Sequence, residues 1–348
     1  MLAAGGFTAA LVAVAACGSS GGTSATSDSN SDAPATTTGS SGLRLAQPTT
    51  IKQLSVPYFG IEHIAEAQGF WKKYNLTVDM VSSLQGAQEV AAVVDGQVQT
   101  IFSNTPDTAL LAIRAGAKVK EVAASEIDSP TYDTVRYYTL KSSHITTAAG
   151  LVGQKVGMPA TSSYYEDALD QYLKEHGVSS SKVTSVAIPA ADLISELLNH
   201  QVAAIAAGDV FYAAIDANAA TASKVHLLFR DMNAFPSATK YLTGYLFSDS
   251  YIAAHPAVIR AFIAGLQAAA KFTQTNPTQA RADIAALTGQ SDPAEIPIPS
   301  YPPDLCIDTS AAQTLALQVE QLGIVPVGTV TSASQWTTNA YNPDKCPS

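Results

Sequence analysis

The sequence has little charge and few cysteines. Charged residues make up 14% of its 348 residues, and three residues are cysteine. Asp and Glu outnumber Lys and Arg by 29 to 19, which gives a formal net charge of −10. A protein that binds nucleic acid through the phosphates needs a basic surface, so this balance excludes nucleic acid as a partner. Only the N-terminus approaches the run of about 20 apolar residues that a membrane span needs.

Several catalytic and cofactor-binding motifs are also absent. The sequence contains no G-x-x-x-x-G-K-[ST] phosphate loop, no H-E-x-x-H, no C-x-x-C and no G-x-S-x-G, and its six histidines are scattered. The glycines at 150, 153 and 157 lack the dinucleotide-binding spacing and fit turns around a strand. We therefore expect a protein that is not an enzyme and that has no cofactor and no metal site.

The first 16 residues form a short apolar segment. They are too few to span a bilayer and fit the core of a signal peptide. The sequence VAACG at 14–18 resembles a bacterial lipobox, in which cleavage leaves the cysteine to carry the lipid. An ordinary secretory signal with an incidental cysteine is the alternative. We expect residues 1–16 to be the signal peptide and Cys17 to anchor the protein on the extracytoplasmic face of the cell membrane.

Residues 17–49 predict a tether. The segment 19–42 consists almost wholly of Ser, Thr, Gly, Ala and Asp. Such a composition cannot bury a core and stays disordered. A flexible tether of about 25 residues reaches roughly 25–30 Å, which would hold a folded domain just off the membrane.

The other two cysteines, Cys306 and Cys346, form an even pair near the C-terminus. In an oxidising compartment we expect them to form a disulfide. It would close a loop of about 40 residues and stabilise the fold by about 3–4 kcal/mol in the chain-entropy model. Two free buried thiols are the alternative.

From residue 51 onward, short apolar runs alternate with segments of helical spacing. The predicted strands lie at 51–56, 76–81, 100–102, 119–124, 136–140, 153–158, 184–188, 202–206 and 241–247. The predicted helices lie at 60–74, 85–95, 106–115, 164–176, 192–200, 255–274, 278–287 and 309–322. This order predicts an α/β protein with two units, each a mainly parallel sheet flanked by helices.

Four segments in order resemble one known family. Residues 64–78 (IAEAQGFWKKYNLTV) are similar to its A-x-x-x-G-F-F-x-x-x-G-L-x-V stretch, and Gly86 with 94–98 (VDGQV) to a later G…L..G.vD segment. Residues 151–159 (LVGQKVGMP) are similar to L-x-G-K-x-V-G-x-P, and 255–262 (HPAVIRAF) to H-P-E-x-V-x-A-F. The chain is identified as a member of the bacterial substrate-binding lipoproteins of ABC importers, in the nitrate/sulfonate/taurine and thiamine-precursor group.

The resemblance implies a two-lobed periplasmic-binding-protein fold of type II with two crossing hinge strands. Lobe 1 would comprise 50–134 plus 246–348, and lobe 2 would comprise 135–245. A monomer of this kind captures a small organic solute, such as a sulfonate, a carboxylate or a taurine-like molecule, and delivers it to the ABC permease in the membrane. A receptor for a pyrimidine-like thiamine precursor is the alternative, followed by an enzyme or a sensor on the same fold.

In open parallel sheets, ligands bind at the carboxyl ends of strands, where helix N-termini present free N–H groups. The residues at these positions are Tyr58, Phe59, Gln85, Gly86, Ser103, Asn104 and Thr105 in lobe 1, and Thr161, Ser162, Ser163 and Tyr164 in lobe 2. Their hydroxyl and amide groups predict a site for a small anion between two helix starts. The alternative is that they only cap the helices.

Three further residues bear on the charge and shape of the ligand. Asp209 falls where many relatives carry a Trp-Glu-Pro-like segment, and a carboxylate there would suit a cationic or N–H-rich group. Arg136, near the expected hinge, is either a clamp for a ligand carboxylate or the partner of Asp209. Tyr212 and neighbouring tyrosines predict aromatic walls for a flat ligand, with packing between the lobes as the alternative.

Overall fold

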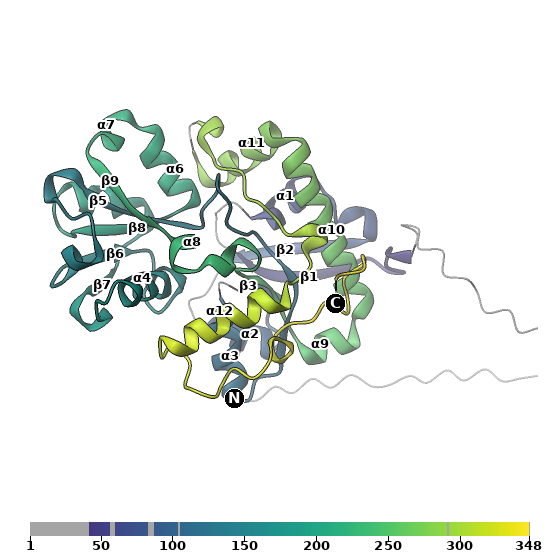
Figure 1. The fold of residues 1–348 in the computed structure, drawn as a ribbon. Coiled ribbons are helices and arrows are strands. Elements are labelled where there is room, and N and C mark those ends of the chain that lie inside the picture. Colours follow the sequence, from purple (N-terminus) through teal and green to yellow (C-terminus); the bar gives the residue numbers. More distant parts are fainter. Residues whose placement is uncertain (1–41, 56–59, 83–86, 104, 291, 348) are drawn as a thin grey trace, which may run out of the picture. The chain divides into compact units, whose positions relative to one another are not determined.

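The computed structural model describes residues 42–55, 60–82, 87–103, 105–290 and 292–347 (Figure 1). The predicted signal peptide, Cys17 and the tether up to residue 41 therefore lie outside the described residues. The last part of the predicted tether belongs to the folded chain. Leu45 is buried, and its N–H donates to the carbonyl of Tyr74 at 3.0 Å. In the described part of the chain, no helix is long and apolar enough to cross a membrane.

The first sheet has five strands in the order β2-β1-β3-β10-β4. Their bounds are β1 Thr49–Ser55, β2 Leu76–Ser82, β3 Thr100–Ser103, β4 Val119–Ala124 and β10 Gly244–Ser248. Strand β1 is parallel to both β2 and β3, whereas β10 is antiparallel to β3 and β4. The helices that follow the first three strands are α1 Ile61–Ala67, α2 Ala87–Val94 and α3 Pro106–Arg114.

The second sheet repeats this plan in the order β7-β6-β8-β5-β9. Its strands are β5 Val135–Leu140, β6 Lys155–Met158, β7 Thr184–Ala187, β8 Ala204–Gly208 and β9 Val225–Arg230. Its main helices are α4 Tyr164–Glu175, α5 Leu193–Leu198 and α6 Asp209–Ala217, with the short α7 Ala219–Ala222 after them. Strand β5 is antiparallel to both of its neighbours. The predicted α/β class with two mainly parallel sheets is thus confirmed.

The two antiparallel strands are those that the chain enters from the other sheet. Residues 125–134 lead from β4 to β5, and residues 231–243 lead from β9 back to β10. These two connections are hydrogen bonded to each other, with Ser125 N–H to Thr243 O and Asp128 N–H to Ala238 O, both at 3.0 Å. Neither connection is a continuous strand. The first, whose residues are all described, contains no strand element, and the second contains the short helices α8 Asp231–Ala234 and η7 Pro236–Thr239.

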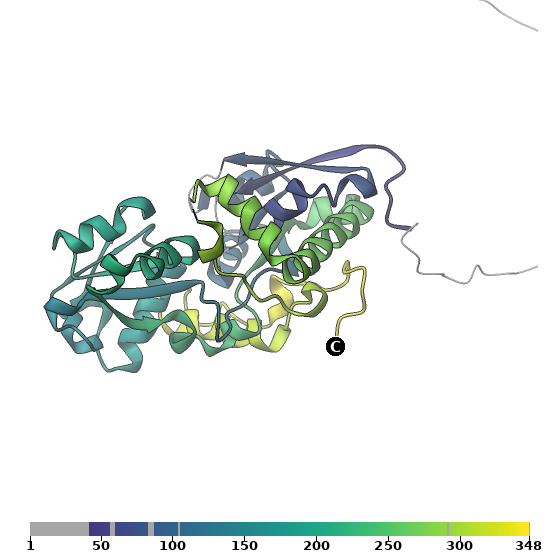
Figure 2. The ribbon, with the colours of Figure 1, turned by 90° about the horizontal axis from the view of Figure 1, so that it is seen from above.

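The C-terminal helices complete the first lobe. They are α9 Asp249–Ala254, α10 Pro256–Thr275, α11 Pro277–Thr288 and α12 Thr309–Gln321. Helix α10 packs beside α1, as Figure 2 shows from above. Trp71 stacks on Phe262 of α10 with 5.5 Å between ring centroids and donates from Nε1 to its carbonyl at 2.9 Å. A Cβ on Gly265 would lie 2.0 Å from the Trp71 ring, so only glycine permits this approach.

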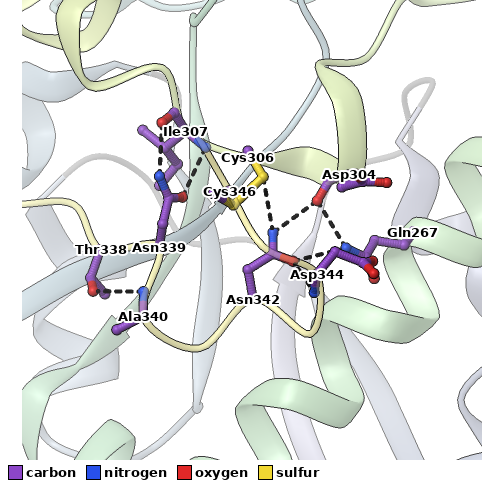
Figure 3. Close-up of a disulfide and its surroundings, with 10 residues drawn as sticks. All are labelled: Gln267, Asp304, Cys306, Ile307, Thr338, Asn339, Ala340, Asn342, Asp344 and Cys346. Atoms are coloured by element: carbon purple, nitrogen blue, oxygen red, sulfur yellow. Dashed lines mark hydrogen bonds between the residues drawn. A yellow bond between two sulfur atoms is a disulfide. The ribbon is translucent and has the colours of Figure 1, made fainter. Parts of the chain in front are cut away.

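Cys306 and Cys346, which are 40 positions apart in the sequence, form the predicted disulfide (Figure 3). The amide of Asn342 lies beside it and donates to Asp304 O at 2.8 Å. The disulfide therefore ties the last residues of the chain to the segment before α12.

Because this disulfide restricts the conformations of the unfolded chain, we expect the Cys306→Ser/Cys346→Ser double variant to lose about 3–4 kcal/mol of unfolding free energy. Urea denaturation of both proteins measures this loss. Dithiothreitol should lower the stability of the wild type and leave that of the double variant unchanged. A wild type that is insensitive to reduction would contradict the prediction.

Candidate functional site

A small cavity lies where the two sheets and the two connections meet. Its volume is about 50 Å³, which is room for a few water molecules. Its described lining residues are Phe102, Glu126, Thr134, Val135, Ser163, Tyr164, Tyr165, Leu242 and Thr243. They come from β3 of the first sheet, β5 and α4 of the second, and both connections. The cavity is therefore a place where a bound molecule would contact both lobes.

One hydroxyl group on the cavity wall has no hydrogen-bond partner. The side-chain oxygen of Thr243 is buried and unpaired, whereas the hydroxyl of Tyr164 interacts with the carboxyl group of Asp231. A buried polar group left unpaired costs about 1–3 kcal/mol, so nearly all such groups in folded proteins find a protein or water partner. The Thr243 hydroxyl is thus available to a molecule in the cavity.

Glu126 places a carboxyl group on the same wall. Its side chain is 3% exposed and accepts a hydrogen bond from the hydroxyl of Ser125. Burial raises its pKa to about 8, and the carboxylates of Glu62 and Asp209 raise the pKa further by repulsion. At neutral pH and without a ligand, this carboxyl group is therefore mostly protonated.

The carboxyl groups that act on Glu126 come from both lobes. Glu62 of α1 is fully buried and accepts a hydrogen bond from the hydroxyl of Tyr245 at 2.6 Å. Asp209 is the first residue of α6, and its Oδ1 accepts from the N–H of Val210 at 2.6 Å. Glu126 lies in the first connection between the sheets. Three acidic side chains thus converge near the cavity.

Buried tyrosines surround this acidic group. Burial raises the pKa of Tyr132 and Tyr301 well above the usual value, and repulsion by Glu126 and Asp209 adds to the effect for both. The hydroxyl oxygen of Tyr301 is buried without a hydrogen-bond partner. These rings stay neutral and offer aromatic surface and hydroxyl groups beside the carboxyls.

The two helix starts expected to hold an anion already bind carboxylates of the chain itself. At the start of α3, Thr105 donates to Asp107, and the carboxylate of Asp107 also accepts from the first backbone N–H groups of the helix. Before α4, the N–H of Ser162 donates to Glu166 at 2.7 Å. At the start of α3, backbone groups that would attract a ligand anion are thus engaged within the chain, whereas at α4 the engaged N–H is that of Ser162, two residues before the helix.

The remaining predicted residues of the α4 start have local roles. Thr161 and Ser162 are exposed, and Ser162 has a positive φ of 52°. Ser163 lines the cavity and donates from Oγ to Ala160 O at 2.7 Å. Tyr164 is buried in the cavity wall. Of this predicted group, Ser163 and Tyr164 therefore reach the cavity.

Arg136 binds one carboxylate of the first connection and one of helix α6 rather than Asp209. Its Nε contacts Asp133 at 2.6 Å, and its Nη1 contacts Asp216 at 2.5 Å. Its guanidinium lies 4.0 Å from the centre of the Tyr212 ring, which it covers. Asp133 also binds Arg230 at 2.5 Å. Arg136 and Tyr212 thus pack the second lobe against the first connection. For Tyr212 this corresponds to the packing role that was the alternative to a ligand-binding role.

The structure places residues at the candidate site that the sequence analysis did not single out, and some of the predicted site residues lie outside the described part of the chain. Glu126, Thr134, Thr243 and Glu62 were not among the expected site residues. The only signal for Glu126 is an acidic pair that directly follows a buried apolar strand, in the sequence AASEID at 123–128. Six predicted residues lie outside the part that can be described, namely Tyr58, Phe59, Gln85, Gly86, Asn104 and the side chain of Ser103.

The raised pKa of Glu126 predicts how stability changes with pH. The unfolded carboxyl releases its proton near pH 4.5 and the folded one near pH 8, so stability is highest below pH 4.5 and falls as the pH rises to 8. The full difference corresponds to at most about 5 kcal/mol. Asp107 and Asp128, with pKa values raised to about 6 and 7, act in the same direction.

We expect Glu126→Gln to lose less unfolding free energy between pH 5 and pH 8 than the wild type, by about 2 kcal/mol or more. Urea denaturation at several pH values measures both slopes. Equal slopes for the two proteins would show that Glu126 ionises normally in the folded state.

Comparisons with known proteins agree with the fold. A family model described as NMT1/THI5 like matches residues 56–280, which is more than half of the chain. No curated protein sequence matches the chain. The structure is similar to the periplasmic aliphatic sulphonate binding protein SsuA from Escherichia coli, with a TM-score of 0.64 and 20% identity over 85% of this chain and 99% of SsuA.

Two other solved structures mark the range of proteins that share this fold. The periplasmic nitrate-binding protein NrtA from Synechocystis PCC 6803 has a TM-score of 0.65 and 10% identity, covering 84% of this chain and 87% of NrtA. The desulfurization enzyme DSZB has a TM-score of 0.58 and 14% identity, covering 84% of this chain and 97% of the enzyme. The likenesses establish the type II periplasmic-binding-protein fold, and the family-model match shows that the chain belongs to the NMT1/THI5-like family.

Proposed function

We propose that this protein is the extracytoplasmic solute-binding receptor of an ABC importer. It captures a small organic solute between its lobes and delivers it to the permease. The observation that carries the proposal is the cavity lined by both sheets and both connections, with an unpaired hydroxyl on Thr243. A ligand there would contact both lobes at once, as a receptor that closes over its solute requires.

The two connections support such a closing motion. They are short, irregular and hydrogen bonded to each other at Ser125–Thr243 and Asp128–Ala238. Asp133 in the first connection binds Arg230 at the end of β9, just before the second. Rotation about a few residues in these segments would open and close the lobes, while this ion pair keeps the connections together.

Binding without chemistry is the function that the residues favour. DSZB demonstrates that an enzyme can use this fold. In this chain, however, the cysteines beyond residue 17 are consumed by the Cys306–Cys346 disulfide. The buried tyrosines near Glu126 suit an organic solute with a flat or apolar part. Anchoring through Cys17 would keep the receptor near its permease.

A thermal-shift screen of the full chain tests the receptor function. The panel should contain organic amines, sulfonates, carboxylates, taurine and aminopyrimidines. We expect one chemical class to raise the melting temperature in a saturable way, because a ligand that binds only the folded state stabilises it. The absence of stabilisation by any class would contradict the proposal.

The Thr243→Val variant locates the binding site. It removes an unpaired hydroxyl without changing the side-chain shape, so we expect unchanged or higher stability without ligand. With the best solute of the screen, we expect about tenfold weaker binding in calorimetry, the value of one hydrogen bond of about 1.4 kcal/mol. Thr314→Val, an exposed change on α12, is the matched control. Equal affinity of Thr243→Val and wild type would place the solute elsewhere.

A further inference from the structure

Several of the described helix starts already carry a carboxyl group of the chain. Besides α3, helix α6 has its first N–H groups next to Asp209, which accepts from Val210 at 2.6 Å. Helix α8 begins with Asp231, which accepts from the N–H of Met232 at 3.0 Å. An anionic ligand at these described starts would have to displace the carboxyl groups.

The ionisable groups that neighbour Glu126 at the cavity are carboxyl groups, and in the described part of the chain it has no cationic partner. Burial raises the pKa of Glu126 most, and the neighbouring charges that raise it further are those of Glu62 and Asp209. The ion pairs that the described arginines make are with Asp133 in the first connection and with Asp216 on α6. Glu126 itself forms no ion pair with any Lys or Arg of the chain, all of which lie in the described part.

The neutral groups around Glu126 also suit a cation. The unpaired hydroxyls of Thr243 and Tyr301 present oxygen lone pairs that accept N–H hydrogen bonds. Both residues are at least nine-tenths buried, at 1% and 9% exposure. The tyrosine rings that line the cavity are those of Tyr164 and Tyr165, and aromatic rings attract cations through their faces. A buried carboxylate is stable when an opposite charge pairs with it, and here a ligand would supply that charge.

We infer that the solute is an organic cation, a protonated amine or amidine, whose N–H groups donate to Glu126 in the interlobe cavity. Asp209 and Glu62 increase the negative potential there. The cavity of about 50 Å³ has room only for the charged group, so the apolar part of the solute requires the lobes to move further apart, and it would then lie beside Tyr164 and Tyr165. The inference rests on the solute-binding function proposed above and specifies its ligand class. It differs from the anions that the names of SsuA and NrtA indicate for those proteins.

The direct test is a matched ligand panel on the full chain at pH 7.5. Benzylamine, 2-phenylethylamine, benzamidine and agmatine are each paired with a neutral alcohol or amide and with a sulfonate or carboxylate of the same skeleton. We expect thermal stabilisation by cationic members and none by their anionic partners. Stabilisation only by anionic or neutral members would overturn the inference and leave the receptor function standing. Stabilisation by none would count against both.

Two variants identify the group that receives the cation. Glu126→Gln keeps the size of the side chain and removes its charge, so we expect the dissociation constant of the best amine to rise at least tenfold. Asp209→Asn retains the oxygen that accepts from Val210 and should weaken binding severalfold. Glu66→Gln, an exposed change on α1, alters the net charge equally and should bind as the wild type does. Unchanged affinity in Glu126→Gln would overturn the inference.

Proton release gives a readout that a structural role of Glu126 would not produce. A cation should bind the ionised carboxyl, so binding at pH 7 should release a proton and tighten as the pH rises from 6 to 8. The titratable groups that face Glu126 from the surrounding elements are Glu62, Asp209, Tyr132, Tyr245 and Tyr301. Calorimetry in buffers of different ionisation enthalpy measures the released proton. Its absence in the wild type, or its persistence in Glu126→Gln, would contradict the assignment.

Discussion

Burial of carboxyl groups where the two connections meet is the constraint on which the site depends. Burial removes most of the water that would solvate an ionised Glu126, and its neighbours Glu62 and Asp209 would repel that charge. The folded protein accommodates this by keeping the Glu126 carboxyl protonated. A bound cation removes the same electrostatic cost in another way, by pairing with the ionised form. Binding of a cation and protonation of Glu126 are therefore two alternative ways to avoid an unpaired, buried carboxylate.

The connections hold these groups in place through a second electrostatic arrangement. Asp133 lies between Arg136 and Arg230, with contacts of 2.6 and 2.5 Å. It thereby joins β5 and β9 of the second lobe to the first connection. Since these charges are paired, the hinge region contributes little net field to the cavity. The charges at the hinge are paired with one another, whereas the ionisable groups that meet near the cavity are carboxyl groups. This difference makes the electrostatic potential of the site negative.

Much of the fold is predictable from the sequence because it depends on local periodicity. The nine expected strands all occur, each within a few residues of its predicted position. The expected helix at 60–74 is shorter, since Gly69 has a positive φ of 67° and ends the helical segment after α1. Strand β9 was not predicted. Its residues 225–230 (VHLLFR) do not alternate between apolar and polar, which is the pattern that marks a strand in the sequence. The disulfide was predictable because two cysteines remained to be paired.

The site was less predictable because it depends on contacts between segments far apart in the sequence. Ser163 and Tyr164 follow a strand end and were found by that rule, whereas Asp209 was singled out by its place in the family resemblance. Glu126 and Thr243 lie in irregular connections, where no periodic pattern marks which way a side chain faces. The predicted anion site failed to gain support for a related reason. Sequence indicates a helix start, but only the structure shows that Asp107 occupies N–H groups at the start of α3 and that Glu166 accepts from Ser162 just before α4.

The most direct measurement is a crystal structure of the protein with the amine that stabilises it most. The account predicts the ligand nitrogen within about 3 Å of a Glu126 oxygen, with the tyrosine rings against its apolar part. A ligand whose negatively charged group lies against the starts of α3 and α4, with Glu126 remote from it, would contradict the account.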